Sequence, residues 1–245
     1  MNWLTVHVVA VVFVATLIRS TFGFGEALVA VPLLALRLPV QVAAPLAVLV
    51  SITVAAIVML QDWRDVHARA AGWLVVSSLV GIPLGLLLLT RVDGRIVKAV
   101  LGLVIIAFAA WSLRRRVPFE LKRDRFEWLM GFGLCAGVLG GAYGMNGPPL
   151  VVYGSLRRWS AAQFRATLQG YFLPASLAGM AGYWLAGLWV PTVTRFYLLS
   201  LPATVIATLL GRVLNQRLSP RTFFAYVYAG LLAIGIVLLV QAMRG

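Results

Sequence analysis

The sequence predicts an all-α membrane protein of many spans, built as two inverted repeats of about five segments each. Three observations predict this class. The chain is 62% hydrophobic and only 11% charged over 245 residues, long apolar runs recur along all of it, and two glycine-rich motifs stand at matching positions in its halves. Soluble domains carry about 25% charged residues, so a soluble domain with one anchor is excluded. No soluble catalytic domain fits, and we predict no enzyme, no catalytic residue and no cofactor.

The apolar runs define the spans. A helix that crosses the hydrocarbon core of a bilayer needs roughly 20 apolar residues. Long runs of this kind lie at 3–18, 43–60, 72–89, 96–113, 127–143, 165–187, 192–211 and 222–243. Two shorter runs, 26–36 and 147–156, cannot cross alone. Each half therefore has four long helices and one short, broken or re-entrant helix, and we expect a multi-pass protein of the inner (plasma) membrane.

An internal repeat divides the chain. The motif Gly23–Pro32 resembles Gly144–Tyr153, because each places glycines and a polar or small residue before a short apolar stretch. These matches predict a first repeat at 1–116, a charged cytoplasmic linker at 117–126 and a second repeat at 127–245.

The positive charge of the chain, +14 in total, orients these repeats. Lys and Arg accumulate in the cytoplasmic loops of membrane proteins. With the linker placed inside, an inverted arrangement puts most of the basic loop residues on the cytoplasmic side, and a parallel arrangement loses most of that bias. This pattern explains the charge without nucleic acid, which we do not expect as a partner.

The two short segments point to transport. Inverted repeats with glycine- or proline-interrupted segments at matching positions are typical of secondary transporters. Non-helical backbone survives at membrane depth only where it is buried in protein or lines a cavity. Broken helices also present free N–H groups and a positive dipole end, which suit an anion. The candidate segments are 20–26 and 142–149, and we expect them to enclose a small anion that crosses by alternating access.

These residues resemble the TauE/SafE family of sulfite-exporter-like membrane permeases. Gly23-Phe24-Gly25 and Val31-Pro32 match its first glycine-rich motif, and Gly140-Gly141, Gly144 and Gly147-Pro148 match the second copy. Phe164–Thr167 and Tyr171–Leu173 also resemble its second half. Glu26 stands where the family usually has glycine, and Asn146 occupies a position of the second motif. The resemblance implies transport of sulfur-containing or organic anions such as sulfite or sulfonates.

Arg19 and Glu26 carry the charge near the first turn. Arg19 follows an apolar helix, and a charge at membrane depth costs at least ~2.5 kcal/mol, which favours a function such as binding an oxyanion with its planar fork. The alternative is that Arg19 snorkels to the cytoplasmic headgroups. Glu26 begins the short helix and is a candidate proton carrier; alternatively it forms a structural ion pair with Arg19 or caps the helix.

The remaining candidate residues for substrate binding follow the turns or the helix after them. Arg165 and Gln169 are four residues apart and share a helix face. The positive-inside rule also explains Arg165, which the inverted arrangement places near the cytoplasmic surface, and Gln169 lies one turn deeper. Asn146 and Tyr143 flank the second turn, where an amide often satisfies its own backbone. The complete set predicted to bind substrate is Arg19, Gly23, Gly25, Tyr143, Gly144, Asn146, Gly147, Arg165 and Gln169.

Several alternatives stay open. An anion channel or a membrane scaffold without transport would share the same hydropathy. The small-residue series Gly81/Gly85 and Gly133/Gly137/Gly141 indicates close helix packing, and a homodimer is one further use of such series. We expect the lipid bilayer, a small anion and protons as partners. The single Cys135 lies in an apolar run, and the sequence offers no metal site.

Overall fold

The structure is a computed structural model of the chain, and it describes residues 3–62, 68–114, 121, 125–157, 159, 161–215, 231–233 and 235–243. This described part is helical and contains no strand. Most of the predicted linker, at 117–126, lies outside it. The helices are α1 (Trp3–Phe22), α2 (Glu26–Ala35), α3 (Val40–Asp62), α4 (Ala68–Arg91), α5 (Gly94–Arg114), α6 (Phe126–Tyr143), α7 (Gly147–Leu156), α8 (Ala161–Leu185) and α9 (Pro191–Asn215).

The helix lengths confirm the predicted polytopic membrane protein. Among the described residues, five helices are long and apolar enough to cross a bilayer, namely α1, α3, α4, α5 and α9. A shorter apolar helix covers Leu231–Met243 near the end of the chain. The predicted short segments form α2 and α7, each ten residues long. At 1.5 Å per residue, such a helix covers about half of the hydrocarbon core.

The outer surface of the bundle is apolar. Val80 on α4 is 64% exposed, and exposed aliphatic side chains recur along α4 and α9 at helical spacing. In water such a large apolar patch is rare, whereas lipid chains cover it at no cost. These faces therefore meet the bilayer. The exposed residues are Val76, Val80, Leu84 and Leu87 on α4, and Ile206, Leu209, Leu210 and Val213 on α9.

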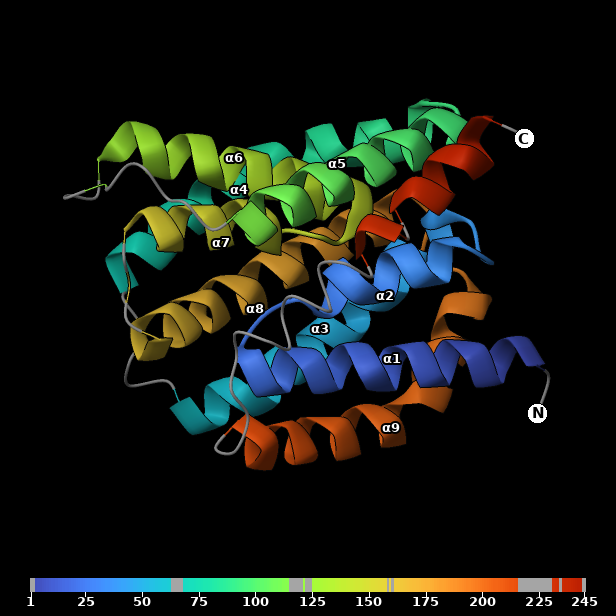
Figure 1. Ribbon diagram of the computed structural model, residues 1–245, viewed down its shortest axis with the longest axis horizontal. Helices are drawn as coiled ribbons and strands as arrows, with labels where there is room; N and C mark the ends of the chain where they lie inside the picture. The colour runs from blue at the N-terminus through green and yellow to red at the C-terminus, as the bar shows by residue number, and fades with distance from the viewer. Residues whose placement is uncertain are drawn as a thin grey trace.

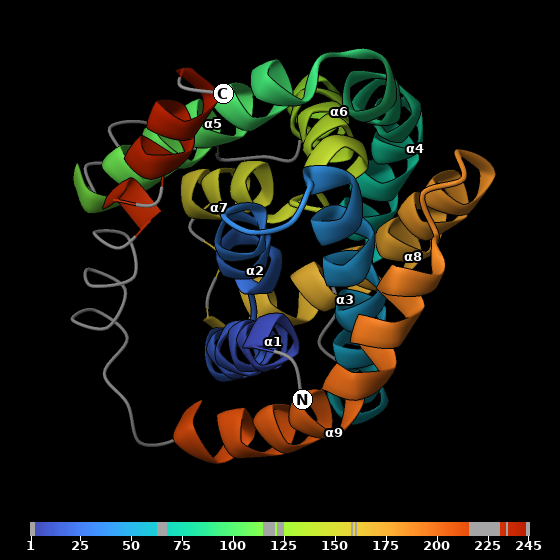
Figure 2. The ribbon, with the colours of Figure 1, turned by 90° about the vertical axis from the view of Figure 1, so that its right-hand side faces the viewer.

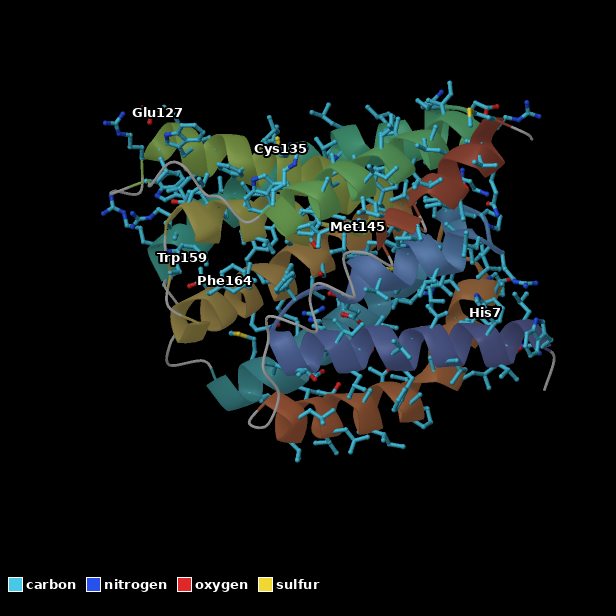
Figure 3. The ribbon with its side chains drawn as sticks, in the orientation of Figure 1. His7, Glu127, Cys135, Met145, Trp159 and Phe164 are labelled. Carbon is cyan, nitrogen blue, oxygen red and sulfur yellow. The ribbon has the colours of Figure 1, made fainter. Side chains whose placement is uncertain are left out.

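Helices from the two halves of the chain alternate in the packing (Figures 1 and 2). The long helices cross at an angle, since Figure 2 views α1 nearly end-on and shows α3 and α9 along much of their length. Helix α1 packs along α9, α4 packs along α6, and α3 packs against α8. Figure 3 shows His7, near the start of α1, and Glu127, near the start of α6, at opposite ends of the bundle. The first helices of the two halves therefore run in opposite directions.

Glycines bring α4 and α6 into close contact, as the small-residue series predicts. A Cβ atom added at Gly81 or Gly85 of α4 would collide with the backbone of α6. One added at Gly137 would lie 2.7 Å from the Cα of Ser78 on α4, and one at Gly141 would meet the carbonyl of Ile82. Only residues without a side chain allow such an approach, and the resulting van der Waals contact is what holds helices together in lipid.

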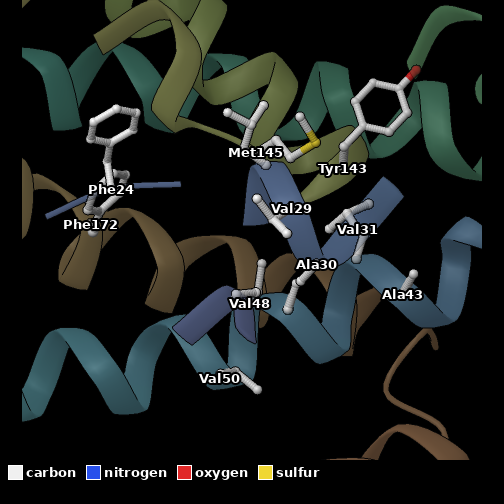
Figure 4. Packing of buried hydrophobic residues seen from close by; sticks show 14 of the residues in the cluster. Phe24, Val29, Ala30, Val31, Ala43, Val48, Val50, Tyr143, Met145 and Phe172 are labelled. Atoms are coloured by element: carbon white, nitrogen blue, oxygen red, sulfur yellow. The ribbon is translucent and has the colours of Figure 1, made fainter. Parts of the chain in front are cut away.

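The short helix α2 is enclosed by the rest of the protein. Eight of its ten residues are buried, including Val29 and Val31. Figure 4 shows these residues between Val48 of α3 and Met145, which lies in the turn after α6. A chain segment that reverses inside a bilayer must be buried in this way, because lipid offers no partner for its backbone polar groups.

Candidate functional site

The first turn of the site joins α1 to α2 and depends on glycine. Gly23 and Gly25 have φ angles of 85° and 102°, in the left-handed region that other residues rarely adopt. The N–H of Gly23 donates to the carbonyl of Arg19 over 2.6 Å, and the carbonyl of Gly25 accepts from the N–H of Val29 over 3.1 Å. The chain thus reverses in three residues and places Glu26 as the first residue of α2.

The second turn joins α6 to α7 in the same manner. Gly144 ends α6 with a φ of 66°, and its N–H donates to the carbonyl of Gly140 over 2.8 Å. This single bond from a left-handed glycine is the simple αL cap, and the N–H of Met145 donates to a further carbonyl, that of Leu139, over 3.1 Å. Helix α7 then begins at Gly147, followed by two prolines whose missing N–H groups do no harm in a first helical turn.

The two turns meet around one small cavity. It is lined by residues 24–28 of the first turn and 144–148 of the second, together with Arg19, Ser51 and Phe172. The cavity has room of about 20 Å³, enough for about one water molecule. Both predicted segments, 20–26 and 142–149, therefore contribute to one site although they lie more than a hundred residues apart in the chain.

Arg19 lies at the centre of this site and does not snorkel. It is only 3% exposed, and its guanidinium is held by groups from three helices. Nη1 forms an ion pair with Oε2 of Glu26 over 2.5 Å and donates to Oγ of Ser51, also over 2.5 Å. Nη2 donates to Oε1 of Gln169 over 3.1 Å, and the guanidinium carbon lies 4.9 Å from the centre of the Phe172 ring.

Some N–H donors of the Arg19 guanidinium are free to bind another partner. A guanidinium has five N–H donors in a fixed plane. Glu26 and Ser51 accept from Nη1, and Gln169 accepts from Nη2. Nε is buried and finds no hydrogen-bond acceptor among the described residues. Nε and Nη2 together thus retain donors for an oxyanion, whose adjacent oxygens suit such a fork.

Gln169 connects Arg19 to the backbone of the first turn. Its amide oxygen accepts from Arg19, and its amide nitrogen donates to the carbonyl of Gly23 over 3.1 Å. The residue is buried, with 2% of its surface exposed. Gln169 therefore ties α8, in the second half of the chain, to the charged turn of the first half.

Glu26 is paired with Arg19, and it is also the first residue of a helix. Its Oε1 accepts from the hydroxyl of Thr16 over 3.5 Å, in addition to the ion pair through Oε2. A carboxylate is favoured at the positive end of the helix dipole. The ion-pair interpretation of Glu26 is thus correct for this conformation. The proton-carrier hypothesis is compatible with it, because a paired carboxylate can bind a proton when its partner is taken up by another anion.

The other predicted residues divide into those that line the cavity and those that do not. Gly25, Gly144, Asn146 and Gly147 line it, and Gly23 supplies the carbonyl bound by Gln169. Asn146 also forms a hydrogen bond with Tyr171 through its side chain. The Tyr143 hydroxyl instead donates to the carbonyl of Val97 on α5 over 3.0 Å, so it faces away from the cavity. The side chain of Arg165 lies outside the described part of the structure.

Sequence reasoning did not select Ser51, Ser176, Thr16 or Phe172. Ser51 on α3 and Ser176 on α8 are both buried, with their hydroxyl oxygens 3.4 Å apart beside Arg19. The available signal was a hydroxyl in the middle of a long apolar run, as at Ser51. A lone serine is a weak signal because it can bond to its own helix backbone, as Thr53 does by donating to the carbonyl of Leu49.

Comparison with known proteins places the chain in a family. A family model described as "Sulfite exporter TauE/SafE" matches residues 8–238. The chain belongs to the TauE/SafE family. A protein of Cupriavidus necator described as "Probable sulfite/organosulfonate exporter TauE" is 27% identical over 183 residues, which cover 74% of this chain and 70% of that protein. No solved structure matches the chain. Membership in this transporter family confirms the resemblance seen in the glycine motifs.

Proposed function

We propose that this protein is a secondary transporter of small sulfur-containing anions, sulfite or organosulfonates, in the inner (plasma) membrane. The observation that carries the proposal is Arg19, a buried guanidinium with spare donors that lines a cavity between two broken-helix turns. The name of the Cupriavidus necator relative supports the substrate class. The binding groups are Arg19 and Asn146, with the backbone of Gly25, Gly144 and Gly147 around the cavity.

The size of the cavity favours transport through an occluded state. Sulfite, with its sulfur and three oxygens, does not fit a space for one water molecule. The two turns must therefore separate to admit the anion, and they close again around it. A site that is accessible only when one turn moves is what alternating access requires, whereas an open channel would need a continuous wet path.

The packing supports two inverted halves that rock against each other. The first helices of the halves run in opposite directions. In each half, the first helix packs on the fourth helix of the other half, α1 on α9 and α6 on α4. Both of these helix pairs also approach closely at a glycine. A Cβ at Gly85 would meet the backbone of Ala142, and one at Gly211 would meet that of Thr21.

The test is counterflow of labelled methanesulfonate in proteoliposomes. Arg19→Gln is expected to lower the initial rate at least about a hundredfold, because it removes the positive partner of a buried anion, a contact worth about 3–5 kcal/mol. Arg37→Gln is the matched control, since Arg37 is an exposed arginine between α2 and α3. It is expected to keep the wild-type rate.

Two outcomes would contradict the proposal. If Arg19→Gln keeps full counterflow, Arg19 does not bind the anion. If the wild-type protein gives a flux that does not saturate and shows no counterflow, the protein is a channel and not a carrier. Saturable counterflow that is lost with Arg19 is the expected result.

A further inference from the structure

We propose that Glu26 is the internal counter-ion of Arg19 and that a transported anion replaces it, so that one proton binds to Glu26 for each anion carried. Ionised Glu26 and a bound anion are then mutually exclusive. This inference rests on the proposed function and adds its coupling ion and its stoichiometry. It begins from the ion pair of 2.5 Å that occupies the site in this structure.

The geometry makes Glu26 a competitor for the anion. The carboxylate of Glu26 accepts from Nη1 of Arg19, where an oxygen of a bound anion would otherwise accept. The same Nη1 also donates to Ser51, so both of its N–H groups are in use. The cavity beside them admits only about one water molecule. An anion that engages Arg19 must therefore displace the Glu26 carboxylate or share the guanidinium with it.

The net charge of the site argues against a state in which ionised Glu26 and the anion both bind the Arg19 guanidinium. Arg19 and Glu26 are the ionisable residues among those described as lining the cavity. The other polar neighbours are uncharged: Thr16 from α1, Ser51 and Ser176 from α3 and α8, Gln169 and Tyr171 from α8, and Asn146 before α7. With Glu26 ionised, a bound monoanion would leave one uncompensated negative charge in a buried site, which is strongly unfavourable. Protonation of Glu26 removes that charge.

Two forms of the site are therefore neutral. One is the empty site with the Arg19–Glu26 ion pair, and the other is the site with Arg19, the anion and protonated Glu26. The remaining forms, an empty site with protonated Glu26 or an anion beside ionised Glu26, carry a net buried charge. Only the neutral forms close without leaving a charge in a low-dielectric interior. The anion and the proton thus cross together, and the empty carrier returns with the ion pair formed.

Binding of methanesulfonate to the purified full chain tests the exchange directly. Methanesulfonate is a strong acid and stays a monoanion, so the protein alone titrates. The Kd is measured from about pH 5 to about pH 9. Wherever Glu26 is ionised in the empty site and protonated in the complex, the Kd of the wild type is expected to rise about tenfold per pH unit, because each bound anion takes up one proton. Glu26→Gln is expected to bind the anion with a Kd that does not change with pH.

The matched control is Glu127→Gln, which makes the same chemical change at an exposed carboxylate in the first turn of α6. It is expected to keep the wild-type pH slope. Glu26→Asp keeps a titratable carboxyl group and is expected to retain the slope as well. The exchange is overturned if the wild type binds methanesulfonate with a Kd independent of pH, or if Glu26→Gln keeps the wild-type slope.

A second measurement needs no variant. In proteoliposomes with a pH difference and the membrane potential clamped at zero, methanesulfonate is expected to accumulate on the alkaline side about tenfold per pH unit, as one-to-one coupling requires. Equal concentrations at equilibrium, with counterflow intact, would overturn the coupling and leave the carrier function standing. Absence of any binding or counterflow would instead contradict the proposed function itself.

Discussion

The two broken-helix turns of this protein share a backbone design and differ in their charge. The first turn has two glycines with positive φ and the second has one; both turns are followed by a ten-residue helix, and both line the same cavity. When the two motifs are aligned, Gly147 stands where the first turn has Glu26, and Gly140 stands where it has Arg19. The first turn therefore supplies the ion pair, while the second supplies an amide, at Asn146, and backbone groups.

This difference indicates that the two turns share a backbone arrangement and not a chemistry. In the second half, the residues without side chains allow α6 to approach α4 closely, and the carbonyl of Gly140 accepts from Tyr183 over 2.9 Å. An arginine at that position would have to displace Asn146, whose Cβ already lies 3.4 Å from the site of a Gly140 Cβ. One turn with a single ion pair and one turn without charge suit a site that must be neutral when the two turns meet.

The largest effect is expected from breaking the ion pair on one side only. Arg19→Gln or Glu26→Gln alone leaves an uncompensated buried charge, and each is expected to lower the free energy of unfolding by about 3–5 kcal/mol. The double variant removes both charges and is expected to cost far less than the two single losses together. Chemical unfolding followed by tryptophan fluorescence measures the three values. Additive losses would mean that the two charges do not stabilise each other.

A smaller effect is expected at the glycine contact that holds the uncharged turn. Gly137→Ala places a Cβ 2.7 Å from the Cα of Ser78 and is expected to lower the free energy of unfolding by about 1–3 kcal/mol, since two helix backbones must move apart. Gly131→Ala, on the same helix with no atom within 4 Å of its Cβ, is the control. Equal stability of the two variants would show that the α4–α6 approach does not support this turn.

The smallest effect is expected at the amide of the second turn. Asn146→Leu removes one neutral hydrogen-bonding group from the cavity, and such a group contributes about 1 kcal/mol, or about fivefold in KM for methanesulfonate counterflow. The loss is expected to stay well below that of Arg19→Gln measured in the same assay. A loss as large as that of Arg19→Gln would mean that the second turn carries as much of the anion binding as the first.

Much of the fold could be predicted from the sequence, since the signals are local. The run 26–36 became α2 at Glu26–Ala35, and 147–156 became α7 with the same bounds. A hydrophobic run tells how long a helix is and whether it can span, because each residue contributes its own transfer free energy to lipid. The glycine series on α4 and α6 likewise predicted close packing, since only small residues permit it.

The site could be predicted only in part. Arg19 was selected because a charge at membrane depth is costly, Glu26 because it begins the short helix, and Asn146 because it flanks the second turn. All three line the cavity. Tyr143 was selected only because it adjoins the second turn, and its hydroxyl reaches α5 instead. Position in the sequence does not reveal the direction of a side chain, which depends on how far a helix has turned about its axis.

The sequence by itself determined membrane residence, the short segments, the turns and the family. The tertiary structure decided that Arg19 is buried, that it meets Glu26 and Ser51, and that it bonds to Gln169 from the other half of the chain. The physical reason is that hydropathy and glycine spacing act within one segment, whereas an ion pair and its hydrogen bonds need atoms from several helices at defined distances. Those distances exist only after the helices have packed.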